Sequence, residues 1–392
     1  MRNYQLHNAS TSHPRGIKML GIYIHIPFCI SKCPYCDFYS IPMSESAADS
    51  YASALLRTIK SAAQTLTPKR GNGLLPADTI YFGGGTPTVF GTNRILQILE
   101  CIREHFNISW AAEITIEANP ATCTEEDLKI LHTAGVNRIS FGVQSMHDSE
   151  LRTLKRPHTA LEARHAIESA HKAGFGHISA DLMLAIPGQT PQSLKSSIKT
   201  LSGLAVDHIS AYILKIEDGT PFATQDISRF CPDEDESATL YLECINKLRH
   251  HGFAQYEISN FAKPGGQSRH NLKYWKLEPY IGIGPGAFSF YDGERFHFPR
   301  DLAMFNAADN PFTLRVSDGP GGDFEEYIML RLRLSDGLNL VAAKTLYPAA
   351  DTAKIQAHAN ELPEFIEIDN EIIRLTPKGF LLSNAVIAHL LA

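Results

Sequence analysis

The stretch Ile24-His-Ile-Pro-Phe-Cys-Ile-Ser-Lys-Cys-Pro-Tyr-Cys-Asp-Phe38 places three of the chain's seven cysteines within eight residues. It continues an apolar, β-branched run at 20–26 that ends at a proline. Such a run predicts a buried strand, and closely spaced cysteines predict a site for a soft metal. We therefore expect the first strand of the fold to deliver a metal site at its C-terminal end.

Downstream of these cysteines, helix and strand patterns alternate. Strands are expected at 20–26, 79–82, 113–118, 138–143, 177–183 and 208–213. Helices are expected at 44–66, 93–105, 124–134, 159–172 and 191–204. Strands separated by helices of this length pair in parallel through right-handed crossovers. The predicted fold class is therefore α/β, a partial (β/α)6 barrel related to the eight-stranded TIM barrel.

Polar residues fall near the C-terminal ends of these strands. The cysteines follow the first strand, and the glycine run 83–85 with Thr86 follows the second. Glu117 and Asn119 close the third strand, Gln144 closes the fourth and Asp181 lies on the fifth. Because the loops after the strands of such a barrel converge on one face, we expect these residues to share an active face.

The regular alternation stops after the sixth strand. We expect a helix at 233–251, a short strand at 256–259, a loop-rich stretch at 262–290, and a separate module from residue 323. That module ends in a hairpin turning at Asp369-Asn370 and an apolar-striped helix, which indicates a winged-helix-like α+β domain. The predicted domains are a flexible tail 1–18, a barrel 19–232, an extension 233–322 and the module 323–392.

Composition restricts the function classes. A formal net charge of -6 gives no basic footprint for nucleic acid, and residues 323–392 hold six Lys or Arg against ten Asp or Glu. No apolar run is long enough for a spanning helix, so we expect membrane contact at most through a partner. Cys101, Cys123, Cys231 and Cys244 are scattered singly, which favours reduced core thiols in a cytoplasmic protein.

The spacing of Cys29, Cys33 and Cys36 favours an iron-sulfur cluster. Three thiolates at i, i+4 and i+7 can hold a 4Fe-4S cluster and leave one iron open to chelate S-adenosylmethionine. A glutaredoxin-like pair at Cys33 and Cys36 is one alternative, but it has no use for Cys29 or the glycine run. A zinc knuckle is another, but it requires a second ligand pair in a recognisable spacing nearby.

The other motifs are each ambiguous alone. Gly83 to Gly85 can present backbone N–H groups to a ligand or simply form a tight turn. Glu117 and Asp181 offer acceptors, and Gln144 and Arg156 offer donors, although each type is often structural. The segment His270-Asn-Leu-Lys-Tyr-Trp275 allows an aromatic core cluster or, on an exposed glycine-flanked loop, ligation of haem iron by His270.

Taken together, these motifs resemble a known superfamily. The C-x3-C-x2-C signature, Gly83-Gly-Gly-Thr-Pro87, Glu117-Ala-Asn-Pro120, Ile139-Ser-Phe-Gly-Val-Gln-Ser145 and Pro187-Gly-Gln-Thr190 resemble the radical S-adenosylmethionine proteins related to oxygen-independent coproporphyrinogen III oxidase. The segment 270–275 resembles the His-Asn-x-x-Tyr-Trp motif of the HemW-type haem chaperones. Phe38 also favours the chaperones, because the oxidases carry a further cysteine there.

The resemblance implies residue roles. It implies cluster ligation by Cys29, Cys33 and Cys36, and haem binding by His270, Asn271, Tyr274 and Trp275. It implies S-adenosylmethionine contacts from Tyr23, Tyr35, Gly84, Gly85, Thr86, Glu117, Gln144, Arg156, Asp181 and Phe288. Two positions depart from the pattern: Leu184-Ala185-Ile186 stands where relatives read Tyr-Gly-Leu, and Phe288 stands where the chaperones often have a histidine.

Two functions follow from the resemblance. The first is a haem chaperone that binds haem and passes it to an acceptor protein, with the 4Fe-4S cluster and S-adenosylmethionine as cofactors. The second is a coproporphyrinogen III oxidase that acts through a 5′-deoxyadenosyl radical. The sequence favours the chaperone and leaves the acceptor, the electron donor and the oligomeric state unassigned.

Overall fold

The computed structural model describes residues 18–67, 73–225 and 227–392, and most of the predicted tail 1–18 lies outside them. One twelve-stranded sheet dominates it, in the order β14-β13-β12-β11-β1-β4-β5-β6-β7-β8-β10-β9. The six predicted parallel strands are its centre: β1 (Leu20–Ile26), β4 (Pro76–Gly84), β5 (Asn107–Ala118), β6 (Arg138–Gln144), β7 (His177–Leu184) and β8 (His208–Ile213). The partial barrel is confirmed.

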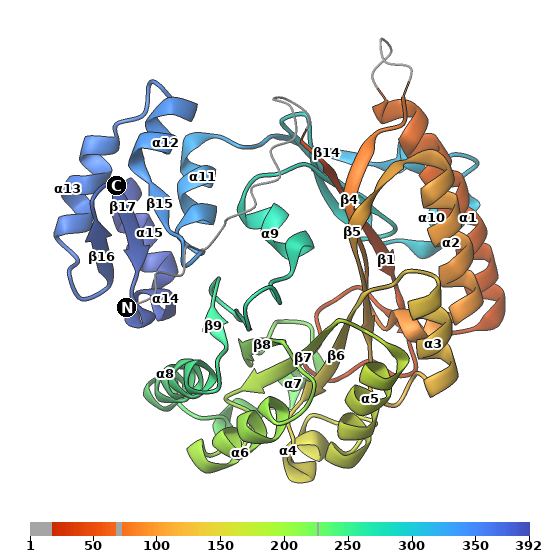
Figure 1. Cartoon of the computed structure of the whole chain (residues 1–392), viewed down its shortest axis with the longest axis horizontal. Helices are drawn as coiled ribbons and strands as arrows, with labels where there is room; N and C mark the ends of the chain where they lie inside the picture. The colour runs from red at the N-terminus through yellow and green to blue at the C-terminus, as the bar shows by residue number, and fades with distance from the viewer. Residues whose placement is uncertain (1–17, 68–72, 226) are drawn as a thin grey trace, which may run out of the picture.

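Helices cover the outer side of this curved sheet (Figure 1). They are α1 (Glu45–Leu66), α2 (Thr92–His105), α3 (Glu125–Thr133), α5 (Ala160–Ala173) and α6 (Pro191–Ser202), together with a short α4 (Asp148–Thr153) that the sequence reading missed. Thr124, Thr159 and Thr190 each cap a helix by accepting a hydrogen bond from the third helical N–H. These caps explain why the predicted helix starts are accurate to about one residue.

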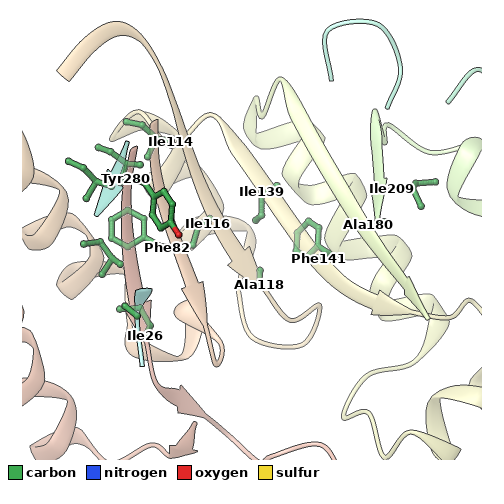
Figure 2. Packing of buried hydrophobic residues seen from close by; sticks show 14 of the residues in the cluster. Ile26, Phe82, Ile114, Ile116, Ala118, Ile139, Phe141, Ala180, Ile209 and Tyr280 are labelled. Atoms are coloured by element: carbon green, nitrogen blue, oxygen red, sulfur yellow. The ribbon is translucent and has the colours of Figure 1, made fainter. Parts of the chain in front are cut away.

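The core lies between the sheet and the helices. Alternate residues of β1, namely Ile22, Ile24 and Ile26, are fully buried, as are Phe82 and Ile116 on the next two strands. Figure 2 shows side chains of this cluster along the successive strands. Because the apolar residues of each strand point outward to the helices, the alternate positions of β1, β4 and β5 face the inner side of the barrel.

The segment 254–320 contains more regular structure than the sequence predicted. The predicted helix at 233–251 is present before it as α8 (Glu234–His250). The segment itself contains β9 (Ala254–Gln255), β10 (Asn260–Ala262), α9 (Arg269–Trp275), β11 (Tyr280–Ile283), β12 (Phe288–Tyr291), β13 (Glu294–His297), α10 (Leu302–Ala307) and β14 (Val316–Pro320). The strand expected at 256–259 is wrong, because Tyr256 N donates to Asn260 O and closes a turn between β9 and β10. The loop-rich interpretation of 262–290 is also wrong, since β11 pairs in parallel with β1.

The chain ends in helices around a small sheet. The helices are α11 (Phe324–Arg331), α12 (Leu340–Leu346), α13 (Thr352–Asn360), α14 (Pro377–Leu381) and α15 (Ser383–Leu391). The strands are β15 (Leu338–Asn339), β16 (Ile366–Asp369) and β17 (Ile372–Leu375), in the order β15-β17-β16. The predicted hairpin is β16–β17, and the arrangement fits the winged-helix-like prediction. Among the described residues no helix is long and apolar enough to cross a membrane.

Candidate functional site

The cysteine loop is held at both ends. Cys29 ends the short strand β2 (Phe28–Cys29), which pairs with β3 (Ile41–Pro42), and Met43 N donates to Cys29 O at 3.1 Å. Within the loop, Cys36 N donates to Cys33 O at 3.1 Å. All three thiols are free and partly accessible. A strand-anchored loop with three reduced cysteines therefore lies at the C-terminal end of β1, as the sequence predicts.

Arg156 lies against this loop. Its Nη1 donates to Cys33 Sγ at 3.3 Å and to Tyr35 Oη at 3.4 Å, and its Nη2 donates to Gly142 O at 2.7 Å. On the opposite side Thr86 Oγ1 lies 3.6 Å from Cys29 Sγ. The structure thus brings three of the predicted cofactor residues, Tyr35, Thr86 and Arg156, into contact with the cysteines. The guanidinium thus holds the cysteine loop against β6 through its contacts with Cys33, Tyr35 and Gly142.

The glycine run is required by the cysteine loop. Gly85 N donates to Ile26 O at 2.8 Å, and a Cβ on Gly85 would stand 2.6 Å from Phe28 O and 3.0 Å from Cys29 Sγ. Gly84 has a φ of +118°, which L side chains rarely adopt. The run is therefore a close backbone approach between β4 and the cysteine loop rather than a generic turn.

Two partly buried carboxyl groups lie on the inner side of the barrel. Glu117 accepts hydrogen bonds from Tyr81 Oη at 2.8 Å and from Gly84 N at 3.1 Å, and burial raises its pKa to about 7. Asp181 accepts a hydrogen bond from Ser140 Oγ at 3.2 Å, and burial raises its pKa as well. These acceptors are placed to bind hydroxyl or ammonium groups of a ligand in front of the glycine run.

The raised pKa of Glu117 predicts a pH effect on stability. The unfolded chain loses this proton near the ordinary value of 4.5 and the folded protein near 7, so the folded state binds more protons between them. The free energy of unfolding should therefore fall as the pH rises through this window, by on the order of 3 kcal/mol. Glu117→Gln, in which the amide can satisfy both Tyr81 and Gly84, should remove that fall.

Urea unfolding of both proteins without cofactors, at intervals from pH 4.5 to 8, measures the difference. Glu257, whose pKa burial also raises to about 7, titrates in both proteins and cancels in the comparison. If the free energy of unfolding changes with pH in the same way in both proteins, the raised pKa of Glu117 is contradicted.

Three other predicted cofactor residues are dispersed around the site. Tyr23 Oη lies 3.0 Å from His25 Nδ1, on the inner side of β1. Gln144 adopts a positive φ of 69° at the end of β6, a conformation uncommon for residues other than glycine. Phe288 starts β12, which β11 separates from β1, so it lies at the margin of the site rather than beside the cysteines. Ala185, in the segment 184–186 that departs from the expected family pattern, has a positive φ of 58°, a conformation that glycine adopts more readily than alanine.

The expected exposed loop around His270 is wrong. His270 lies on helix α9, is 0% exposed, and has both ring nitrogens engaged: Nδ1 lies 2.8 Å from Thr79 Oγ1 and Nε2 lies 2.8 Å from Tyr274 Oη. Burial lowers its pKa to about 3. Its ring stacks on Tyr81 at 5.2 Å. Of the two alternatives for this motif, the aromatic core cluster is the one that the structure describes.

The segment 270–275 lies on helix α9, which packs against the inner side of the barrel. Glu113 on β5 accepts hydrogen bonds from the backbone N of Arg269 at 3.0 Å and of His270 at 2.9 Å, and so fixes the start of α9. Asn271 and Trp275 are partly buried on the same helix. Figure 1 shows α9 on the inner side of the sheet, opposite the covering helices. Helix α9 thus occupies the interior of the partial barrel, which in a closed barrel is filled by strand side chains.

Sequence reasoning missed the residues that support this site. Tyr81 and Glu113 were not singled out, because alternate positions in an apolar strand are indistinguishable from core positions without the fold. One signal was available: Tyr81 lies two residues before Gly83, on the same strand face as that glycine. Because side chains alternate between the two faces of a strand, the Tyr81 side chain lies on the same face as Gly83, which is the face expected to meet a ligand.

Comparisons with known proteins agree with this geometry. Residues 23–201 match the radical SAM superfamily and residues 323–382 match the HemN C-terminal domain. The heme chaperone HemW of Lactococcus lactis subsp. lactis is 32% identical over 371 residues, which cover 93% of this chain and 95% of that protein. The chain belongs to the HemW family. The HemW of Escherichia coli K12 is also 32% identical, over 95% of this chain and 98% of its own length.

The fold of this HemW family member also matches a solved structure. Coproporphyrinogen III oxidase (HemN) from Escherichia coli, described as a radical SAM enzyme, superposes with a TM-score of 0.80 over 95% of this chain and 90% of that chain. Its sequence identity is 22%, so this match concerns the fold alone. The α/β partial barrel and the C-terminal module are thereby confirmed as a HemN-like arrangement.

Proposed function

We propose that this protein is a haem chaperone that binds haem and transfers it to an acceptor protein. The observation that carries the proposal is its 32% identity, over nearly the whole of both chains, to proteins named heme chaperone HemW. Phe38 adds support, because the sequence resemblance places a further cysteine at this position in the oxidases.

We further propose that Cys29, Cys33 and Cys36 hold a 4Fe-4S cluster. Their thiols fit this group, since all three are free and the guanidinium of Arg156 lies beside one of them. Of the remaining cysteines, Cys101 lies on α2 and Cys244 on α8, so neither is part of the cysteine loop. When bound, a cluster with three protein ligands leaves one iron open to S-adenosylmethionine.

For S-adenosylmethionine the proposal rests on the inner face of the barrel. Gly84, Gly85 and Thr86 offer backbone close to the cysteine loop, and the partly buried Glu117 and Asp181 offer acceptors for hydroxyl or ammonium groups. Tyr23, Tyr35, Gln144, Arg156 and Phe288 remain the further contacts implied by the family. In this proposal the carboxylates orient the ligand, and Arg156 holds the loop against it.

The proposed haem function needs a ligand for the iron. His270 has no ring nitrogen available for this, because both nitrogens already have hydrogen-bond partners. Ligation by its Nε2 requires the hydroxyl of Tyr274 to leave, and ligation by Nδ1 requires Thr79 to leave. Haem binding by His270, Asn271, Tyr274 and Trp275 therefore stays a sequence-based prediction. Its contacts support a positioning role for the motif, which fixes α9 within the barrel.

The test is an anaerobic reconstitution of the full chain with iron and sulfide, followed by titration with hemin. We expect stoichiometric haem binding, seen as a shifted Soret band, and release of the haem to a haem-free acceptor haemoprotein. The same preparation with S-adenosylmethionine and a reductant should not convert coproporphyrinogen III. Appearance of protoporphyrinogen IX together with absent haem binding would replace the chaperone by the oxidase.

A further inference from the structure

A second histidine, His297 on β13, has the environment that His270 lacks. Its Nδ1 lies 2.8 and 3.0 Å from the two carboxylate oxygens of Asp318 on the neighbouring β14. Within the described part of the chain its Nε2 has no hydrogen-bond partner, and 29% of the side chain is exposed. A carboxylate on Nδ1 fixes the proton there and leaves the Nε2 lone pair available for a metal.

Apolar side chains flank this imidazole. Phe288 on β12 pairs directly with His297, with ring centroids 5.3 Å apart, and is 55% exposed. Val316 on β14 pairs with His297 from the other side and is 45% exposed. Residues that pair across strands project from the same face. Three adjacent strands therefore present an exposed apolar strip with a histidine at its centre.

The register connects this strip to the proposed cofactor site. Tyr23 on β1 pairs with Gly282 on β11, and Tyr280, two residues before Gly282, pairs with Phe290 on β12. Because β11 and β12 are antiparallel, Phe288 lies level with Gly282 and hence with Tyr23. The strip is on the inner face of the sheet, two strands from Tyr23.

We propose that His297 Nε2 ligates haem iron and that Phe288 packs on the macrocycle, with Asp318 as the positioning residue for the imidazole. The inference rests on the proposed haem function and gives that function a site. Haem requires an imidazole nitrogen without a hydrogen-bond partner and an apolar surface for its ring, and the strip supplies both. It also places the haem on the face that carries the cysteine loop.

Two other histidine–carboxylate pairs among the described residues lie in different surroundings. His177 Nδ1 lies 2.6 Å from Asp207 Oδ2 and its side chain is 42% exposed, but it pairs across the strands with Arg138. His389 uses Nε2 for Glu361, and that pair lies on the C-terminal module. The pair at His177 is thus a matched control, because it repeats the geometry of the imidazole and carboxylate without the aromatic neighbour.

The experiment titrates the reconstituted full chain and its variants with hemin, and records affinity and the spectrum of the ferric and ferrous forms. His297→Ala should weaken binding more than about tenfold and abolish the histidine-ligated spectrum. Asp318→Asn should weaken binding by about tenfold, as expected for loss of a carboxylate that orients a metal-ligating histidine. Exogenous imidazole should restore the ligated spectrum to His297→Ala. His177→Ala should bind as the wild type does.

The outcomes separate this inference from the proposed function. If the wild-type chain binds haem and His297→Ala binds it with the same affinity and spectrum, the inference is wrong and the haem function stands. If the wild-type chain binds no haem, the proposed function falls and the inference falls with it. Because His297 is partly exposed at the sheet margin, circular dichroism should show all four proteins folded.

Discussion

Cys33→Ala is expected to lose the proposed iron-sulfur cluster. Cys29 and Cys36 alone supply two of the three sulfur ligands, and the guanidinium of Arg156 would then face the vacated position instead of the Cys33 sulfur. Iron and acid-labile sulfide after anaerobic reconstitution should fall to near background. Equilibrium binding of S-adenosylmethionine should weaken at the same time, because in the proposed site an open iron of the cluster chelates it.

The matched control for this variant is Cys231→Ala. Cys231 is also free and partly accessible, but its Sγ interacts with Ile227 O in a separate turn. Its replacement should leave iron and sulfide at the wild-type level. Undiminished iron in Cys33→Ala would end the cluster assignment.

His270→Ala is expected to destabilise the fold by about 3 kcal/mol, because it removes a fully buried ring and leaves Thr79 and Tyr274 without their partner. Tyr274→Phe removes one hydroxyl and should cost about 1 kcal/mol. Urea unfolding followed by circular dichroism measures both. Any loss of haem binding in His270→Ala should then track the unfolded fraction.

The same pair of variants tests the role of the motif in haem binding. Tyr274→Phe frees Nε2 of His270, so a ligand role for His270 predicts tighter haem binding in that variant. A positioning role predicts unchanged binding. A folded His270→Ala protein of wild-type stability that cannot bind haem would contradict the buried, structural role.

The central fold was predictable because two local signals agreed. Apolar strands alternate with helices whose threonine caps mark their starts, as at Thr159 and Thr190. The later strands were missed because they are short and are stabilised by distant partners: β11 has four residues and pairs with β1, more than 250 positions earlier. Local sequence patterns contain little information about such pairings.

The cysteine loop and Glu117 were predictable because their spacing and their place after strands carry chemical information. The burial of His270 was not, since its depth depends on Thr79 and Tyr81, which lie far away in the sequence. The same limit explains why His297 was overlooked. Its pairing with Phe288 and Asp318 exists only once three strands have come together.

The pairing of β1 with β11 has a consequence for biosynthesis. The first strand leaves the ribosome early, yet one of its two neighbours is encoded at Tyr280–Ile283. At typical translation rates that interval is roughly 15 to 60 s, during which one edge of β1, adjoining the cysteine loop, stays unpaired. Insertion of the proposed cluster into a completed sheet would therefore follow synthesis of most of the chain. The nascent protein is thus expected to need protection of its thiols, or assistance from molecular chaperones, during that interval.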